Sequence, residues 1–344
     1  MPCVSVVIPA YKHRAFIRQT LDSVFAQTFS DYEVIVVNDG SPDDTAAVLE
    51  PLIAAGRIRY FEQPNRGQAV ARNRGVDEAR GEFVALLDDD DVWPADKLQW
   101  QVQLLRDRPD VGAVAGDRFW WDGGAIPELA RPETGPRLLT FESLFGGNPL
   151  ASPGQVLIRK KHIESLGGFN QELWGSDDFD LWIRLSRITR FEAYDRIALL
   201  YRAHATNASG DLDRMLLNTR RVINSHAGAA ARSDLPRLLQ TANRWIYEYV
   251  GSRLVERLQN ELGHMQIREA ARSCHSLATF AEWGWSDPTL VRRFLREMFP
   301  VRRMLVNHLP TPVVGCIRAV KRLGHASAIA AEGADDPTCI GAAE

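Results

Sequence analysis

Four adjacent aspartates, Asp88, Asp89, Asp90 and Asp91, directly follow the apolar run at residues 83–87. Carboxylates this close together repel one another unless a cation neutralises them. Mg²⁺ and Mn²⁺ prefer such oxygen ligands and commonly share them with the phosphates of a substrate. A solvated acidic turn before a helix is the alternative, since aspartate is favoured there as well. The position directly after a strand favours the metal site.

Two earlier segments also carry groups suited to a ligand. Asp39 stands in the turn NDGS, where it can accept hydrogen bonds from a nucleobase N–H or simply cap the next helix. In RGQAVARNRG, residues 66–75, small side chains let a ligand approach, and Arg72 is suited to meet a diphosphate. The alternative for this second segment is a helix with a solvated basic face.

A second acidic cluster, with Asp177 and Asp178, lies between Trp174 and Trp182. A carboxylate in such surroundings suits a general base, because partial burial raises its basicity. Aromatic rings also stack on sugars, although helix capping and core packing explain the same residues. His204 follows a strand, and a neutral imidazole there can supply a further metal ligand, although a lone histidine is more often structural.

Regularly alternating strands and helices must position these residues. Strands are expected at residues 3–9, 32–37, 58–61 and 83–87, with helices at about 14–27, 43–55 and 67–79. This alternation indicates βαβ units and a parallel sheet, in which ligands bind beyond the carboxyl ends of the strands. A less regular stretch follows, with helices at 94–107 and 177–188 and strands at 111–116, 155–159 and 197–202. Two or three helices are expected within 212–283, and a disordered tail at 326–344.

The composition indicates a water-soluble globular protein. The 344 residues are 45% hydrophobic and 25% charged, and the net charge of −3 gives no reason to expect a nucleic-acid partner. The four cysteines are scattered, which is typical of reduced thiols in a cytoplasmic protein. We find neither a signal peptide at the start nor an apolar run of the roughly 18 residues that span a bilayer.

Taken together and in order, these motifs resemble glycosyltransferase family 2, whose members are inverting, nucleotide-sugar-dependent enzymes with the GT-A fold. The similarity covers residues 3–210. The matching segments are VSVVIPAY (4–11), Ser23 and Gln27, EVIVVNDGS (33–41), GQAVARNRG (67–75), GEFVALLDDDD (81–91), GGFN (167–170), DDFDLW (177–182) and YRAH (201–204).

The resemblance assigns a role to each matching position. It implies that the nucleotide-sugar is bound by Pro9, Ala10, Tyr11, Asp39, Gly67, Arg72, Asp88 and Asp89. It implies Asp90 and His204 as ligands of Mn²⁺ or Mg²⁺ and Asp178 as the catalytic base. The residue types themselves indicate acceptor contacts at Trp174, Asp177 and Trp182. The sequence departs from the family pattern at Lys12, where Asn is common, at Asn38, where Asp is frequent, and at Asp177, where Glu is frequent.

The implied architecture is an α/β GT-A domain at residues 1–210, a Rossmann-like and mostly parallel sheet flanked by helices. A helical C-terminal region at 211–325 and the tail at 326–344 follow it. The implied reaction moves a sugar, expected to come from a UDP-sugar, to a hydroxyl of a glycan or glycolipid with inversion. The expected setting is bacterial cell-surface polysaccharide or lipopolysaccharide synthesis, in the cytoplasm or on the inner face of the membrane.

Two other functions compete with this interpretation. A nucleotidyltransferase that makes nucleotide-sugars usually has a glycine-rich loop after its first strand, and YKHRAF (11–16) contains no glycine. A non-catalytic sugar-binding or nucleotide-binding module would be expected to lose one acidic cluster, and both are intact. The particular sugar, the acceptor and the oligomeric state stay open.

The C-terminal region also carries a basic segment. Residues 291–325 hold eight Lys or Arg against the single acid Glu297, a local charge of +7, interleaved with apolar residues. Such a segment can lie on anionic lipid, where each basic residue contributes about 1 kcal/mol. The alternative is a basic surface packed on the catalytic domain. We hypothesise peripheral membrane association, which suits a lipid-linked acceptor.

Overall fold

The computed structural model describes residues 1–124, 135–204, 207–264 and 266–284, together with Arg293 and Arg296. Most of the basic segment and the whole tail at 326–344 lie outside the described residues. By its internal contacts the chain divides into two compact units, Met1–Gly210 and Asp211–Glu344.

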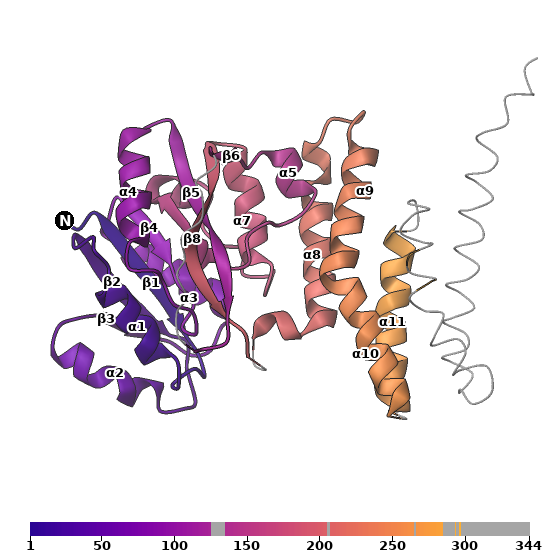
Figure 1. Ribbon diagram of the computed structural model, residues 1–344, viewed down its shortest axis with the longest axis horizontal. Coiled ribbons are helices and arrows are strands. Elements are labelled where there is room, and N and C mark those ends of the chain that lie inside the picture. Colours follow the sequence, from indigo (N-terminus) through magenta and orange to yellow (C-terminus); the bar gives the residue numbers. More distant parts are fainter. Residues whose placement is uncertain (125–134, 205–206, 265, 285–292, 294–295, 297–344) are drawn as a thin grey trace, which may run out of the picture. The chain divides into compact units, whose positions relative to one another are not determined.

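The first unit is built on a mixed, mostly parallel sheet. Its strands are β1 (Val4–Ala10), β2 (Tyr32–Asn38), β3 (Arg59–Glu62), β4 (Phe83–Leu86), β5 (Val111–Trp121), β6 (Arg137–Leu138), β7 (Val156–Arg159) and β8 (Arg190–Arg202). The spatial order is β3-β2-β1-β4-β7-β5-β8-β6 (Figure 1). The first four strands in this order run parallel, as do β5 and β8, whereas β7 is antiparallel to both of its neighbours. This arrangement confirms the predicted fold class.

Helices cover the sheet. They are α1 (Ile17–Phe25), α2 (Thr45–Ala54), α3 (Gln68–Glu78), α4 (Lys97–Asp107), α5 (Phe141–Phe145), α6 (Lys160–Ser165) and α7 (Asp177–Ser186). The β-branched run of β1 is buried along its whole length, as expected for a central parallel strand. Helix α3 packs closely on this strand, because a Cβ atom on Gly75 would come within 2.2 Å of Val7.

The main difference from the predicted elements lies in β8. The sequence predicts a strand at 197–202, whereas β8 begins at Arg190. Its first half contains Glu192, which is buried and accepts hydrogen bonds from Arg108, Arg190 and Tyr194. A charged residue at a core position hides the apolar alternation by which a strand is normally recognised. The short helix α6 was not predicted either.

The second unit is helical in its described part. It contains α8 (Leu212–His226), α9 (Leu235–Ile246), α10 (Ser252–Gly263) and α11 (Ile267–Gly284). The sequence predicts two or three helices in this region. Helices α9 and α10 continue into one another through a π-helical turn at Tyr247–Gly251, so the described part of the unit holds three continuous helical segments. Among the described residues, we find no helix with both the length and the apolar character that a bilayer crossing needs.

Candidate active site

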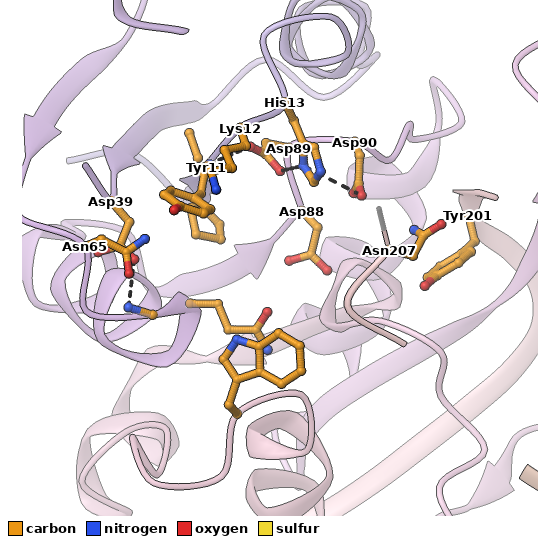
Figure 2. Close-up of a pocket in the computed structure, with 15 residues that line it drawn as sticks. Tyr11, Lys12, His13, Asp39, Asn65, Asp88, Asp89, Asp90, Tyr201 and Asn207 are labelled. Carbon is orange, nitrogen blue, oxygen red and sulfur yellow. Dashed lines mark hydrogen bonds and ion pairs between the residues drawn. The ribbon is translucent and has the colours of Figure 1, made fainter. Parts of the chain in front are cut away.

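A cavity of about 390 Å³ opens at the carboxyl ends of β1, β2 and β4 (Figure 2). Residues 9–13 at the end of β1 and just after it, Asp39 after β2 and residues 88–90 after β4 contribute to its walls, together with Gly67 and Trp174. Asp39 lies at one end of the cavity and Asp90 at the other (Figure 2). Most of the predicted donor-binding residues therefore line one cavity, as expected for the edge where parallel strands end.

Asp39 organises the loop that leads into α3. Its Oδ1 accepts hydrogen bonds from the Gln63 side chain at 2.8 Å and from the Arg66 N–H at 3.0 Å. Its Oδ2 accepts one from the Gly67 N–H at 2.7 Å, at a backbone φ of +93° that favours glycine. A carboxylate offers about four acceptor positions, and three are used here. Asp39 thus keeps one acceptor position for a ligand donor such as a nucleobase N–H.

Asp89 joins the loop after β1 to the acidic loop after β4. Its Oδ2 accepts a hydrogen bond from the Tyr11 N–H at 2.8 Å, and its Oδ1 lies 2.7 Å from His13 Nδ1. Burial raises the pKa of Asp89 to about 6. Burial lowers the pKa of His13, but the hydrogen bond to Asp89 and the charges of Asp89 and Asp90 outweigh it and raise the pKa to about 9. The pair is therefore ionic at neutral pH.

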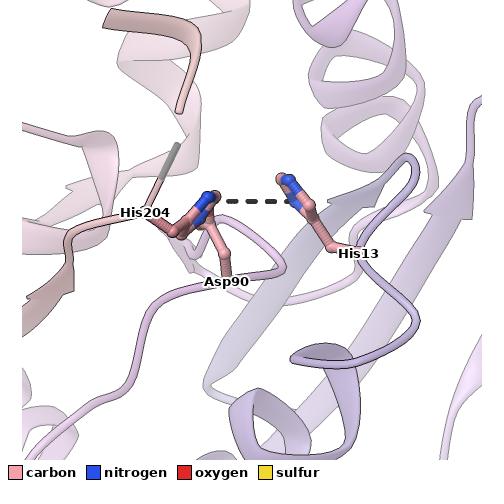
Figure 3. Close-up of side chains that lie close together, drawn as sticks. All are labelled: His13, Asp90 and His204. Carbon is pink, nitrogen blue, oxygen red and sulfur yellow. Dashed lines mark hydrogen bonds and ion pairs between the residues drawn. The ribbon is translucent and has the colours of Figure 1, made fainter. Parts of the chain in front are cut away.

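Asp90 faces two histidines (Figure 3). Its Oδ2 lies 2.8 Å from His204 Nε2 and 3.8 Å from His13 Nδ1. One donor atom from each of the three residues lies within 4.8 Å of the others. Two imidazoles and a carboxylate at this spacing are within reach of a single divalent cation. Asp90 and His204, the two metal ligands that the sequence predicts, thus lie side by side, and His13 lies with them.

Asp91 has a structural role that sets it apart from its three neighbours. It is buried, and its Oδ1 accepts a hydrogen bond from the Arg202 N–H at 2.9 Å. The Arg202 side chain donates to the Asp90 carbonyl and lies over the rings of Phe16 and Trp121, at 4.8 and 4.3 Å. These contacts hold the end of β8 against the acidic loop at residues 88–91. They also place His204, two residues further on, beside Asp90.

Arg72 joins the two acidic clusters. Its guanidinium donates to Asp88 Oδ1 at 2.6 Å and to Asp177 Oδ2 at 2.7 Å, and the residue is only 2% exposed. Gln68 and Ser152 complete the arrangement through Asp177 and Asp88, at 2.7 and 3.0 Å. In this structure the charge of Arg72 is shared between the buried Asp177 and the partly exposed Asp88, and its contact with a diphosphate stays a prediction.

Asp178, at the start of α7, is buried beside this network. Burial and the charge of Asp177 raise its pKa to about 7, and the charge of Arg72 acts in the opposite direction. Its Oδ1 accepts a hydrogen bond from the Phe179 N–H at 2.7 Å. A carboxylate with a pKa near neutrality can take up a proton from a substrate hydroxyl and release it to water.

The predicted acceptor contacts need correction. Trp182 is fully buried against Phe191, with ring centroids 5.7 Å apart, and Asp177 is completely buried as well. Both belong to the interior of the unit, so neither can face an acceptor. Of the three predicted residues, Trp174 lines the cavity.

An exposed aromatic pair beside the cavity was missed by sequence reasoning. Trp120 is 58% exposed, and its ring lies edge-on to that of Tyr201, which lines the cavity, with centroids 4.8 Å apart. The run FWW at the end of β5 was the only available signal, and such a run is usually core.

The decisive comparison is with protein-family models. The model described as Glycosyl transferase family 2 matches residues 5–167, which contain β1 to β4 and the acidic loop. This match places residues 5–167 in glycosyltransferase family 2. The family resemblance seen in the sequence is therefore confirmed.

Relatives and solved structures agree with this family. The chondroitin synthase of Pasteurella multocida is 28% identical over 224 residues, which is 61% of this chain and 21% of that protein. The chain spans about a third or less of the length of the first curated relatives it matches.

Two solved structures share the fold. TarS 1–349 of S. aureus in complex with UDP-GlcNAc has a TM-score of 0.63 at 15% identity, covering 96% of this chain and 92% of that one. The mannosyltransferase PcManGT of Pyrobaculum calidifontis, in complex with GDP-Man and Mn²⁺, has a TM-score of 0.53 at 20% identity, covering 97% and 88%. At these identities the likeness shows the GT-A fold alone.

Proposed function

We propose that this family 2 protein transfers a sugar from a UDP-sugar to a hydroxyl of a glycan or glycolipid acceptor, with inversion at the anomeric carbon. The observation that carries the proposal is the order of groups along one cavity. A carboxylate with a spare acceptor position lies at one end, and the His13, Asp90 and His204 cluster lies at the other. Asp178 has a pKa near 7 and lies close enough to Asp88 for the negative charge of Asp88 to raise that pKa.

The donor is proposed to lie along the cavity with its base at Asp39. The fourth acceptor position of this carboxylate suits the N3–H of uracil, a group that cytosine lacks. Asp88 and Asp89, between Asp39 and Asp90, would face the ribose hydroxyls. The complex of TarS with UDP-GlcNAc supports a uridine donor on this fold.

Mn²⁺ or Mg²⁺ is proposed to bind at Asp90 and His204. The donor atoms present fit such an ion, since an oxygen and an imidazole nitrogen already lie 2.8 Å apart. A bound ion would offset the negative charge that develops on the diphosphate leaving group. The complex of PcManGT with Mn²⁺ supports a metal on this fold.

Asp178 is proposed to be the general base. Its carboxylate would take the proton of the acceptor hydroxyl while that oxygen forms a bond to the anomeric carbon. The bond between the anomeric carbon and the diphosphate oxygen breaks in the same step, and UDP leaves with the electron pair. One displacement from the face opposite the leaving group inverts the anomeric carbon.

The acceptor is proposed to approach over the aromatic side chains near the cavity mouth. Trp174 and Tyr201 line the cavity, and the exposed Trp120 extends the aromatic surface away from it. Aromatic faces suit the apolar faces of sugar rings. The match to a chondroitin synthase supports a polysaccharide acceptor, and we propose bacterial cell-surface glycan synthesis as the setting.

We further propose that residues 1–210 form the catalytic domain and that the protein acts in the cytoplasm. The helical region at 211–325 is proposed to bring it to the inner face of the membrane.

Thermal unfolding with a panel of nucleoside diphosphates and nucleotide-sugars tests the proposed function. A ligand at 100 times its Kd adds about 2.7 kcal/mol to the stability of the folded state. For a domain of this size that corresponds to a Tm increase of several degrees. We expect UDP and at least one UDP-sugar to raise Tm with Mn²⁺, and to raise it less with EDTA or in Asp90→Ala. No response to any nucleotide, or equal responses with Mn²⁺ and EDTA, would contradict the donor or the metal assignment respectively.

A further inference from the structure

His13 belongs to a different part of the fold than Asp90 and His204, the two residues with which it forms the candidate metal site. It lies in the loop after β1, whereas Asp90 follows β4 and His204 follows β8. The two imidazole rings meet edge-on with centroids 5.2 Å apart, and the carboxylate of Asp90 lies between the two side chains (Figure 3). The side chains of His13 and His204 are only 17% and 13% exposed, so both are held largely out of water.

We propose that His13 is the third protein ligand of the divalent cation, with Asp90 and His204. This inference rests on the proposed function, which places the ion at Asp90 and His204. His13 Nδ1 lies 3.8 Å from Asp90 Oδ2, and the donor atoms of all three residues lie within 4.8 Å of one another. His13 Nδ1 faces the acidic loop, because it already contacts Asp89 Oδ1 at 2.7 Å.

The donor set determines which metals the site prefers. Magnesium binds oxygen ligands almost exclusively, whereas imidazole nitrogen suits Zn²⁺ and other transition metals. Two imidazoles with one carboxylate therefore select Mn²⁺, Co²⁺ or Zn²⁺ over Mg²⁺. Without His13 the site would keep a single imidazole, from His204, and its preference for these metals over Mg²⁺ would be weaker. His13 is thus a specificity-determining residue for the metal.

Cation binding by His13 would also prepare the ribose site. In this structure His13 Nδ1 is held by Asp89 Oδ1, while Asp89 Oδ2 accepts from the Tyr11 N–H. To bind the cation, His13 Nδ1 would have to release its proton to solvent and leave Asp89 Oδ1, which would then be available to a ribose hydroxyl. Tyr11 continues to hold the other oxygen, so Asp89 does not leave its place. Metal binding should therefore strengthen nucleoside binding through Asp89 as well as diphosphate binding.

Pulsed electron paramagnetic resonance counts the imidazoles directly. The full-length protein with Mn²⁺ and UDP is compared with and without ¹⁵N-labelled histidine, so that only histidine nitrogens bound to Mn²⁺ change the modulation. We expect two coordinated imidazoles in the wild type and one each in His13→Ala and His204→Ala. A single imidazole in the wild type that persists in His13→Ala overturns the assignment of His13 alone. Absence of any imidazole-bound Mn²⁺ in the wild type contradicts the proposed metal site itself.

Metal affinity gives a second readout that is independent of spectroscopy. At saturating UDP, His13→Ala should weaken Mn²⁺ binding by at least about tenfold, the scale on which even supporting residues of metal sites act. Mg²⁺ binding should change much less, so the ratio of the two Kd values should fall toward one. His162→Ala, a partly buried histidine on α6, is the matched control and should leave both constants unchanged. An equal loss for both metals would mean that His13 only supports the loop.

Discussion

Replacing Asp178 with asparagine should separate donor binding from chemistry. The variant keeps the shape and the hydrogen bond from the Phe179 N–H but can no longer accept a proton. Loss of a general base typically lowers the rate by about 10²–10⁴-fold. The affinity for UDP with Mn²⁺, measured by calorimetry, should stay within about twofold of the wild type, because the base acts on the acceptor.

The pKa of Asp178 also sets the pH dependence. With a pKa of about 7, half of the carboxylates are ionised at pH 7 and about a tenth at pH 6. The kcat/KM for acceptor at saturating donor should therefore fall about tenfold for each pH unit below 7. The charge of Asp177 helps to raise this pKa, so Asp177→Asn should move the acidic limb to lower pH.

As pH rises toward neutrality, the free energy of unfolding should fall while the activity increases. The folded protein holds a proton on Asp178 between pH 3.8 and about 7, where the unfolded chain has lost it. The free energy of unfolding therefore falls as pH rises through this window. Asp178→Asn lacks this penalty, so it should unfold at a higher temperature than the wild type at pH 8, with the difference shrinking toward pH 5.

The assay measures UDP release with the donor found by thermal unfolding, and NMR reads the anomeric configuration of the product. Asp180→Asn is the matched control on the same helix. Asp180 pairs with Arg184, so its loss should lower stability and leave turnover nearly intact. Near-normal turnover in Asp178→Asn, or a product with retained configuration, would refute the assignment of the base.

Four further outcomes are expected. Asp39→Asn should weaken UDP binding, measured by calorimetry, by about 10-fold to 100-fold, because hydrogen bonds to a charged group contribute about 1.5–3 kcal/mol. An unchanged affinity would show that Asp39 does not recognise uracil. Lys12 has a backbone φ of +63°, which is strained for a residue other than glycine. Lys12→Gly should therefore raise the free energy of unfolding, measured in urea, by about 1 kcal/mol. A decrease would show that the side-chain contacts of Lys12 outweigh the strain. Trp120→Ala should raise the acceptor KM and leave UDP affinity unchanged, while equal kinetics would exclude Trp120 from the acceptor surface. A chain ending at Leu290 should lose co-sedimentation with anionic liposomes, and equal sedimentation of both forms would contradict the membrane role of residues 291–325.

Local sequence patterns were sufficient to predict the frame of the site. Apolar runs of β-branched residues predict β1, β2 and β4, because a central parallel strand is buried on both faces. Since the carboxyl ends of such strands meet at one edge, Asp39 and the acidic loop were expected to share a cavity, and both line it. These inferences need only the residues within one element and the general geometry of parallel sheets.

Tertiary structure decided which charges face a ligand and which face one another. Arg72 and Asp177 are 105 residues apart, and their ion pair exists only because α3 and α7 meet beside the sheet. No periodicity within either helix reveals that contact, so Arg72 was expected at the diphosphate and Trp182 at the acceptor. His13 shows the converse, because its position after β1 became meaningful once β4 and β8 placed Asp90 and His204 beside it. The sequence thus determined the elements and the edge of the sheet, whereas the packing of distant elements determined the partner of each charged side chain.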